Sequence, residues 1–382
     1  MERGRSARGH AVSRCDSVSD SRSGRDGDWE SACEQLRGKE RAPVCDDLWV
    51  TDAPPGERAW RHILGFLTSQ AVCLAAELAL ADHLAGSPLG LSDLAAVSGA
   101  DAAALGRVLR HLESVGFFEQ RADGRYANTP MSDSLRKDAP GSQRDFAVFV
   151  RRLMYPASVD LLGSVRSGGP AFDRVFGQPL FGYLSEQPDA GEVFSRGMAS
   201  AAALRSQAAL SYPWPPGATV VDVGGSDGAI LTALLLSRPD LTGIVFDLPH
   251  VASRAHTRIE QAGLSGRCQF AGGDFFGQRW PAGDVYLLSG VIHDWDDESA
   301  LRILENARRA VPADGRLVLL EVVLPATSGF HPGKVLDLVM LTMTTGYERA
   351  DRQWRDLLGA ARFEIAHLTP SARVSLIEAR PA

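Results

Sequence analysis

Cysteine is scarce in this chain of 382 residues, and its five copies show no metal-binding or disulfide spacing. No Cys-x-x-Cys or Cys-x-x-His pair occurs, which argues against a zinc site or a disulfide framework. This usage favours a reducing compartment, and we expect a cytoplasmic protein. The five residues are Cys15, Cys33, Cys45, Cys73 and Cys268.

Long apolar runs and an excess of positive charge are also missing. No run approaches the roughly 20 apolar residues of a membrane span, and the charged N-terminus lacks the apolar core of a secretory signal. The formal net charge is -7, whereas nucleic-acid-binding domains are normally basic. We therefore expect a soluble protein without a membrane or nucleic-acid partner.

Composition and breaker residues divide the chain into four segments. The first is rich in Arg, Ser, Asp and Gly and poor in large apolar residues, so it buries too little surface to offset its ordering entropy, and we expect disorder. Apolar residues then recur at helical spacing from Ala59 onwards. The predicted segments are a disordered extension 1–52, a small domain 53–141, a helical connector 142–215 that could wall one side of a pocket, and a C-terminal domain 216–382.

The pattern of the small domain predicts helices followed by a β-hairpin, which is the order of a winged helix. Ser92 and Ala100–Asp101 stand at expected helix starts, and Asp123–Gly124 at the hairpin turn. A winged helix can bind DNA, so a regulator is one alternative, although basic residues on a helix are commonly its solvated side. The candidate recognition face is Arg107, Arg110 and His111.

The C-terminal domain, residues 216–382, shows strand-like and helix-like segments in alternation, which indicates a parallel sheet covered by helices. Helices are expected near 229–239 and 298–311, and a closing antiparallel hairpin over 362–381. The expected strands are 219–223, 243–247, 267–271, 284–288 and 316–323.

A glycine loop ends the first of these strands, where the chain reads VVDVGGSDG, Val220–Gly228. Ligands of doubly wound sheets bind at such strand ends, and an acidic residue about 20 positions on, here Asp247, commonly accepts ribose hydroxyls. This pattern alone would serve NAD or another adenosine cofactor. However, no G-x-G-x-x-G follows the strand, and an acidic loop suits a cationic cofactor better than a pyrophosphate.

Five further segments, FDLPHV, GGDFF, HDWDDE, GRLVLLEVVLP and DLVMLTMTTGYER, follow the glycine loop in that order. Together the six segments resemble the S-adenosylmethionine-dependent O-methyltransferases of the plant caffeate and bacterial polyketide type. The likeness covers residues from about 55 to 382. It implies an α/β fold, a Rossmann-like class I methyltransferase sheet with an N-terminal helical winged-helix dimerisation domain, a homodimer, and a role in specialised or antibiotic metabolism.

The resemblance assigns roles at the cofactor, with S-adenosylhomocysteine as product. Gly224 and Gly225 would pack against the methionine part, Asp247 would bind the ribose, and Asp274 with Phe275 would hold the adenine. The remaining cofactor residues are Asp222, Leu248 and Ser289. Two positions depart from the family pattern: Ser226 replaces a usual third glycine, so the backbone there is expected not to need a glycine-only conformation, and Ser289 stands where plant members often carry lysine.

The resemblance makes His293 the general base, at the end of the strand DVYLLSGVI, with Glu321 and Glu348 as supporting carboxylates. A phenol of pKa near 10 is mostly neutral at pH 7, so a base for the attacking hydroxyl is useful. A lone strand-end histidine is commonly structural, and Asp296, Asp297 and Glu298 are expected to cap and charge the next helix.

An aromatic acceptor with a hydroxyl, most simply a phenol, is the expected methyl acceptor, although nitrogen or carbon acceptors stay open. With a histidine base a divalent metal ion is not required, and none is expected. A second alternative is a methyltransferase-fold enzyme that binds the cofactor for a hydroxylation, decarboxylation or cyclisation. The expected acceptor pocket consists of Met198, Asp294, Trp295, Met340 and Met343, although methionines at helical spacing are as often plain core.

Overall fold

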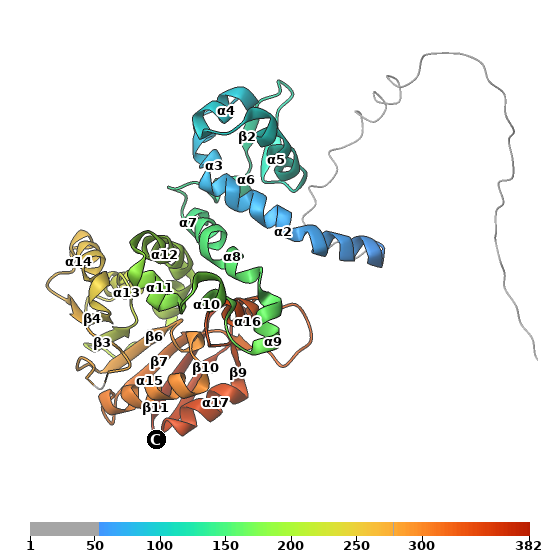
Figure 1. Ribbon diagram of the computed structural model, residues 1–382. Coiled ribbons are helices and arrows are strands. Elements are labelled where there is room, and N and C mark those ends of the chain that lie inside the picture. Colours follow the sequence, from blue (N-terminus) through green and yellow to red (C-terminus); the bar gives the residue numbers. More distant parts are fainter. Residues whose placement is uncertain (1–52, 278) are drawn as a thin grey trace, which may run out of the picture. The chain divides into compact units, whose positions relative to one another are not determined.

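A seven-stranded mixed sheet is the centre of the structure, a computed structural model that describes residues 53–277 and 279–382 (Figure 1). The predicted extension over residues 1–52 lies outside the described residues. Its strands, in spatial order, are β10 (Phe363–Thr369), β11 (Ser375–Pro381), β7 (Arg316–Glu321), β6 (Val285–Ser289), β3 (Thr219–Val223), β4 (Thr242–Asp247) and β5 (Cys268–Gly272).

The direction of the strands defines where a ligand can bind. β3, β4, β5, β6 and β7 are parallel, whereas β11 is antiparallel to β7 and forms the predicted closing hairpin with β10. From β3 the chain builds outward through β4 to β5, then returns to place β6 on the other side of β3. The switch point of the sheet therefore lies between the carboxyl ends of β3 and β6, where ligands of such sheets bind.

Both faces of the sheet are buried, which explains the nearly continuous apolar strands. Leu317 and Leu319 of β7 point into a core with α15 (Asp297–Ala310) and α17 (Asp351–Ala360). Val318 and Leu320, between them, point into a second core with α13 (Ala229–Ser237) and α14 (Ala252–Gln261). Four of the five predicted strands, now β3, β4, β5 and β6, are confirmed to within one residue at each end.

The N-terminal part folds around its own apolar cluster, which includes Leu94, Leu109 and Phe118. As predicted, Asp101 caps a helix, since its carboxylate accepts a hydrogen bond from Ala104 N at 2.8 Å. Ser92 does not, because that helix begins one residue earlier, after Gly90. The elements are α2 (Pro55–Glu77), α3 (Leu80–His83), α4 (Leu91–Ser98), α5 (Ala102–Ser114), β1 (Phe118–Gln120), β2 (Tyr126–Asn128) and α6 (Pro130–Asp133).

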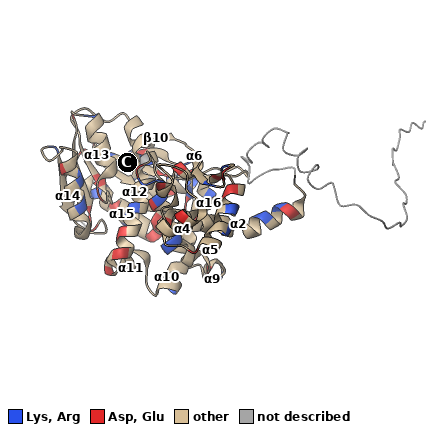
Figure 2. Ribbon diagram, turned by 90° about the horizontal axis from the view of Figure 1, so that it is seen from above, with Lys and Arg blue, Asp and Glu red and all other residues tan. Residues whose placement is uncertain are grey.

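The connector is helical, as its sequence predicts. Charges of both signs occur along its helices and along α2 (Figure 2). No helix in the described part of the chain is long and apolar enough to cross a membrane. The connector elements are α7 (Arg144–Phe149), the π-helical turn η1 (Val150–Met154), α8 (Tyr155–Ser158), α9 (Leu161–Ser167), α10 (Ala171–Phe176), α11 (Leu180–Glu186) and α12 (Pro188–Ser211).

The strand predicted over 316–323 is shorter in the structure. β7 ends at Glu321, and a separate strand β8 (Val323–Leu324) pairs in parallel with β9 (Arg349–Ala350). The carboxylate of Glu321 accepts hydrogen bonds from the backbone N–H groups of Val291 and Ile292, just after β6. The pairing of β8 with β9 brings the GYER segment beside the carboxyl end of β7. The short turns η2 (Pro249–Val251) and η3 (Ile292–Asp294) and helix α16 (Pro332–Met343) complete the domain.

Ser226, in the glycine loop after β3, has a backbone φ of +51°. The sequence-based expectation that this position avoids a glycine-favouring conformation is therefore wrong. A residue of another strand stabilises this backbone conformation, because Ser226 N donates a hydrogen bond of 2.7 Å to Asp247 Oδ2 at the end of β4. A residue with a side chain loses about 1–2 kcal/mol in the left-handed region, so this loop holds local strain.

Replacing Ser226 with glycine is expected to stabilise the protein by roughly 0.5–1 kcal/mol. Glycine removes the left-handed penalty, although the more flexible unfolded chain offsets part of the gain. The free energy of unfolding would be measured in urea at a fixed protein concentration. Ser253→Gly is the control, because Ser253 lies exposed in α14, where glycine should destabilise by roughly 0.5–1 kcal/mol. A Ser226→Gly protein less stable than the native one would contradict the strain.

Candidate active site

Two glycines let the backbone of the loop after β3 pack closely against neighbouring side chains. A Cβ atom at Gly224 would lie 2.8 Å from Val291 Cγ2, and one at Gly225 would lie 2.7 Å from the Asp222 carboxyl group. Gly224 also has a φ of +70°, which glycine adopts at no steric cost. The loop can therefore pass close to the residues after β6.

Carboxylates surround this glycine loop. Asp247, at the end of β4, is held by Ser226 N and by Leu248 N, which donates to Oδ1 at 2.6 Å. Asp222 is buried in β3, and its Oδ2 has no hydrogen-bond partner in the described residues. Burial, followed by the charges of Asp247 and Asp227, raises the pKa of Asp222 to about 7. The cleft at the switch point therefore favours a ligand with positive charge or hydrogen-bond donors.

The predicted adenine residues lie after β5, on the next loop. Asp274 is exposed, and its Oδ1 accepts a hydrogen bond from Phe276 N at 2.8 Å. The Phe275 ring packs near Gly224 and lies edge-on to Trp295, with ring centroids 6.0 Å apart. Ser289, at the end of β6, has a buried hydroxyl with no partner among residues 53–277 and 279–382. The structure thus gathers the predicted cofactor residues around one cleft.

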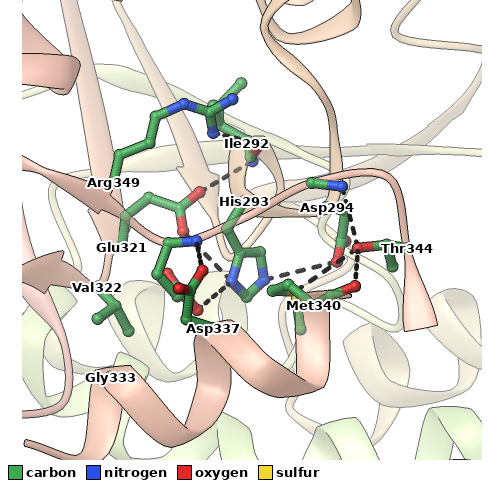
Figure 3. A network of polar contacts seen from close by, with 12 residues as sticks. Ile292, His293, Asp294, Glu321, Val322, Gly333, Asp337, Met340, Thr344 and Arg349 are labelled. Carbon is green, nitrogen blue, oxygen red and sulfur yellow. Dashed lines mark hydrogen bonds and ion pairs between the residues drawn. The ribbon is translucent and has the colours of Figure 1, made fainter. Parts of the chain in front are cut away.

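His293 lies in the turn η3, just beyond β6, and is 8% exposed. Its Nδ1 is 2.9 Å from Glu348 Oε1. An ionised carboxylate can only accept a hydrogen bond, so in the neutral imidazole Nδ1 carries the proton and Nε2 is the basic nitrogen. Nε2 faces Asp294 Oδ1 at 3.7 Å (Figure 3), which is beyond hydrogen-bond distance, so Nε2 can accept a proton from another partner.

Three carboxylates control the protonation of His293. Burial alone would lower its pKa, but Glu321, Asp294 and Glu348 together raise it to about 9. Glu321 Oε2 lies 4.0 Å from Nδ1, while its Oε1 accepts hydrogen bonds from Val291 N and Ile292 N. The two predicted supporting carboxylates therefore have different contacts: Glu348 bonds the ring directly, and Glu321 fixes the turn that carries it.

Several residues that the sequence did not single out hold this arrangement in place. Asp337 of α16 accepts a hydrogen bond from Glu348 N at 2.9 Å (Figure 3). Arg349 is fully buried, and its guanidinium donates to the carbonyls of Ile292 and Trp295 and to Asp297. The sequence held two weak signals of this buried polar network. Asp337 is a carboxylate within a largely apolar helix, and Arg349 directly follows the segment GYE; such groups need polar partners when they are buried.

Gly346 lets the GYER segment approach the histidine turn. A Cβ atom there would lie 2.0 Å from His293 O and 2.3 Å from Trp295 N. The acids after the turn are only partly as predicted. Asp296 caps α15, since it accepts a hydrogen bond from Ser299 N at 2.8 Å. Asp297, by contrast, binds Tyr347 and Arg349 and so joins the two segments.

The predicted acceptor residues separate into two groups. Met343 is buried in an apolar cluster with Phe149 and Phe172 of the connector, and Met198 packs against the same cluster. Met340 is also buried, so the methionines have clear packing roles. Trp295 stacks on Phe181, with ring centroids 5.5 Å apart, and its buried Nε1 has no hydrogen-bond partner in the described chain. Of these residues, Asp294 presents a carboxylate oxygen 3.7 Å from Nε2 of His293.

The residues at the cleft fit S-adenosylmethionine. The acidic surroundings and the unpartnered oxygen atoms of Asp222 and Ser289 offer a cationic nucleoside opposite charge and hydrogen-bond acceptors. Within residues 53–277 and 279–382, no three His, Cys, Asp or Glu side chains are arranged as ligands for a metal ion.

Comparison with known proteins identifies both parts of the chain. Residues 159–364 match the model of the O-methyltransferase domain, and residues 60–138 match that of the O-methyltransferase dimerisation domain. A phenazine O-methyltransferase, PhzM of Lysobacter antibioticus, is 40% identical over 84% of this chain and 94% of its own length. An 8-amino-8-demethylriboflavin N,N-dimethyltransferase of Streptomyces davaonensis is 32% identical over 85% of this chain and 95% of its own.

Solved structures share the fold as well. The crystal structure of LaPhzM superposes with a TM-score of 0.82 at 39% identity, covering 86% of this chain and all of the other. NcsB1 of neocarzinostatin biosynthesis, solved with S-adenosylmethionine and 2-hydroxy-5-methyl naphthoic acid, gives 0.73 at 35% identity and covers 82% and 96%. These matches confirm the predicted class I methyltransferase fold and cofactor, and the chain belongs to the S-adenosylmethionine-dependent O-methyltransferase family.

Proposed function

We propose that this enzyme methylates a hydroxyl group, most simply a phenol, on an aromatic specialised metabolite, with His293 as general base. The observation that carries the proposal is the orientation of His293. Its Nδ1 is held by Glu348 at 2.9 Å, and its Nε2 makes no hydrogen bond within the described chain. Val291, two residues before it, packs closely against Gly224 of the glycine loop.

When bound, S-adenosylmethionine supplies a methyl group on a positively charged sulfur, which leaves as a neutral thioether. The protein therefore needs to provide a base and accurate placement rather than an acid. Nε2 of His293 would take the proton of the acceptor hydroxyl. The pKa of His293, about 9, lies close to that of a phenol near 10, so transfer to the neutral imidazole costs only on the order of 1 kcal/mol. At pH 7 most of His293 carries a second proton, which it must release before it acts as the base. Glu348 and Glu321 would stabilise the imidazolium that forms.

The predicted roles at the cofactor remain part of the proposal. Asp247 would bind the ribose, Asp274 and Phe275 the adenine, and the backbone at Gly224 and Gly225 the methionine part. The remaining cofactor contacts would come from Asp222, Leu248 and Ser289. The positions of these residues around one cleft support these roles.

Asp294 would contact the acceptor, because its carboxylate lies 3.7 Å from Nε2 of His293, and Trp295 would do so through its unpartnered Nε1. The burial of Met340 and the packing of Met198 and Met343 in the connector cluster favour walls of the pocket over direct ligands. We also propose a homodimer formed through residues 53–141, a helical connector over 142–215 and a catalytic domain over 216–382. The match of residues 60–138 to a dimerisation domain supports the dimer over DNA binding.

A nitrogen acceptor is the second candidate. The relative from Streptomyces davaonensis carries the name of an N,N-dimethyltransferase at 32% identity, so the family scaffold accommodates an amine. An amine that is neutral at the working pH needs no base before it attacks. The importance of His293 to the rate would therefore separate the two acceptor classes.

Replacing His293 with alanine is expected to lower turnover by about 10²–10⁴-fold, the usual contribution of a general base, while cofactor affinity stays unchanged. S-adenosylmethionine with an isotopically labelled methyl group would be incubated with a panel of phenols and aromatic amines, and the label followed by mass spectrometry. His367→Ala is the matched control, because His367 is exposed on β10. Equal label transfer by both variants would refute the base, and an acceptor consumed into unlabelled product would indicate a non-methylating reaction.

The pKa of His293 gives a prediction that needs no acceptor. The resonance of His293, identified by its loss in His293→Ala, should titrate near pH 9 in the native protein. Glu348→Gln removes one negative neighbour and should shift the midpoint downward, toward the ordinary value of roughly 6.5. Nuclear magnetic resonance of ¹³C-labelled histidine would measure both midpoints. Glu260→Gln, an exposed change on α14, should leave the midpoint in place, and an unshifted Glu348→Gln midpoint would contradict the assigned pairing.

A further inference from the structure

Arg205 of α12 reaches across to the carboxyl end of β6. A Cβ atom at Gly290 would lie 2.4 Å from Arg205 Nη2 and 2.6 Å from its Cζ. Gly290 is itself fixed, with a φ of +62° and a hydrogen bond from its N–H to Leu320 O at 3.0 Å. The absence of a side chain at residue 290 thus makes room for a guanidinium at the switch point of the sheet.

The guanidinium of Arg205 is in direct contact with no carboxylate of the described chain, although its charge acts on Asp294 and Glu321 from a longer distance. Among residues 53–277 and 279–382 it makes no hydrogen bond and no ion pair within 4.0 Å, although the side chain is half-buried. A guanidinium presents five donors in a planar fork that matches a carboxylate. A half-buried arginine without a partner at a ligand cleft therefore marks a place for an anion.

Several carboxylates lie at this end of the sheet, near Arg205. Burial raises the pKa values of Asp294 and Glu321, and the positive charge of Arg205 acts in the opposite direction on both. Asp222 and Asp247 line the other side, next to the glycine loop. These carboxylates suit the sulfonium, ammonium and ribose of the cofactor, but they would repel its one negative group, the carboxylate of the methionine part.

We propose that Arg205 binds the α-carboxylate of S-adenosylmethionine and of its product. The proposal rests on the proposed function and adds a residue outside the six sequence segments that carry the family resemblance. It also gives a reason for Ser289, the residue before Gly290, at which plant relatives often carry lysine. In this protein the positive charge on that side of the cofactor would come from Arg205 of helix α12 instead of from the end of β6.

The test is the affinity of two ligands for the full-length protein, measured by isothermal titration calorimetry. The first is S-adenosylhomocysteine, and the second is its decarboxylated analogue, which keeps the adenosine, the sulfur and the amine. Arg205→Met should weaken S-adenosylhomocysteine by about 10- to 100-fold, the loss typical of a charged hydrogen bond, and leave the analogue within about twofold. The native protein should bind the analogue more weakly than S-adenosylhomocysteine by a similar factor.

Arg196→Met is the matched control, because Arg196 lies exposed on the same helix and pairs with Glu192 and Asp145. It should leave both affinities unchanged. Equal weakening of both ligands by Arg205→Met would make Arg205 a structural residue and overturn the proposal. Unchanged binding of S-adenosylhomocysteine would also overturn it and leave a carboxylate of the acceptor as the partner. A native protein that binds neither ligand would refute the proposed function itself.

Discussion

The hydrogen bond between His293 Nδ1 and Glu348 Oε1 joins two segments that lie 55 residues apart in the chain. Two further sets of contacts position this pair. The parallel pairing of β8 with β9 places Glu348 beside the end of β7, and Arg349 ties the backbone on both sides of His293 to the same strand. The orientation of a single imidazole thus depends on the path of the chain from β7 through α16 to α17.

Burial and charge act against each other at this histidine, and charge prevails. A buried imidazole without carboxylates would stay neutral, whereas three nearby carboxylates favour the protonated form. Glu321 and Glu348 each retain one buried oxygen without a partner in the described chain. Burying carboxylate oxygens without hydrogen-bond partners costs folding free energy. Such oxygens are therefore typical of a site that binds a cation and not of a core that serves only packing.

Much of the catalytic domain was predictable because its signals are local. The buried parallel strands are short apolar runs, and the glycine loop and His293 stand directly at strand ends, where topology alone puts them in one cleft. Asp337, Arg349 and Arg205 were not predicted, since each acts through a contact with a segment far away in the sequence. The left-handed backbone of Ser226 was missed for a related reason: its cause is the carboxylate of Asp247, 21 residues away.

The close packing at Gly346 limits how the specificity of this enzyme can be altered. Any side chain there would collide with the backbone of His293 and Trp295, so all larger residues would displace the turn that holds the imidazole. Directed evolution toward new acceptors should therefore leave residues 346–349 unchanged. Libraries would be better placed in the connector, where Met198 and Phe181 lie on helices that carry no part of the histidine turn.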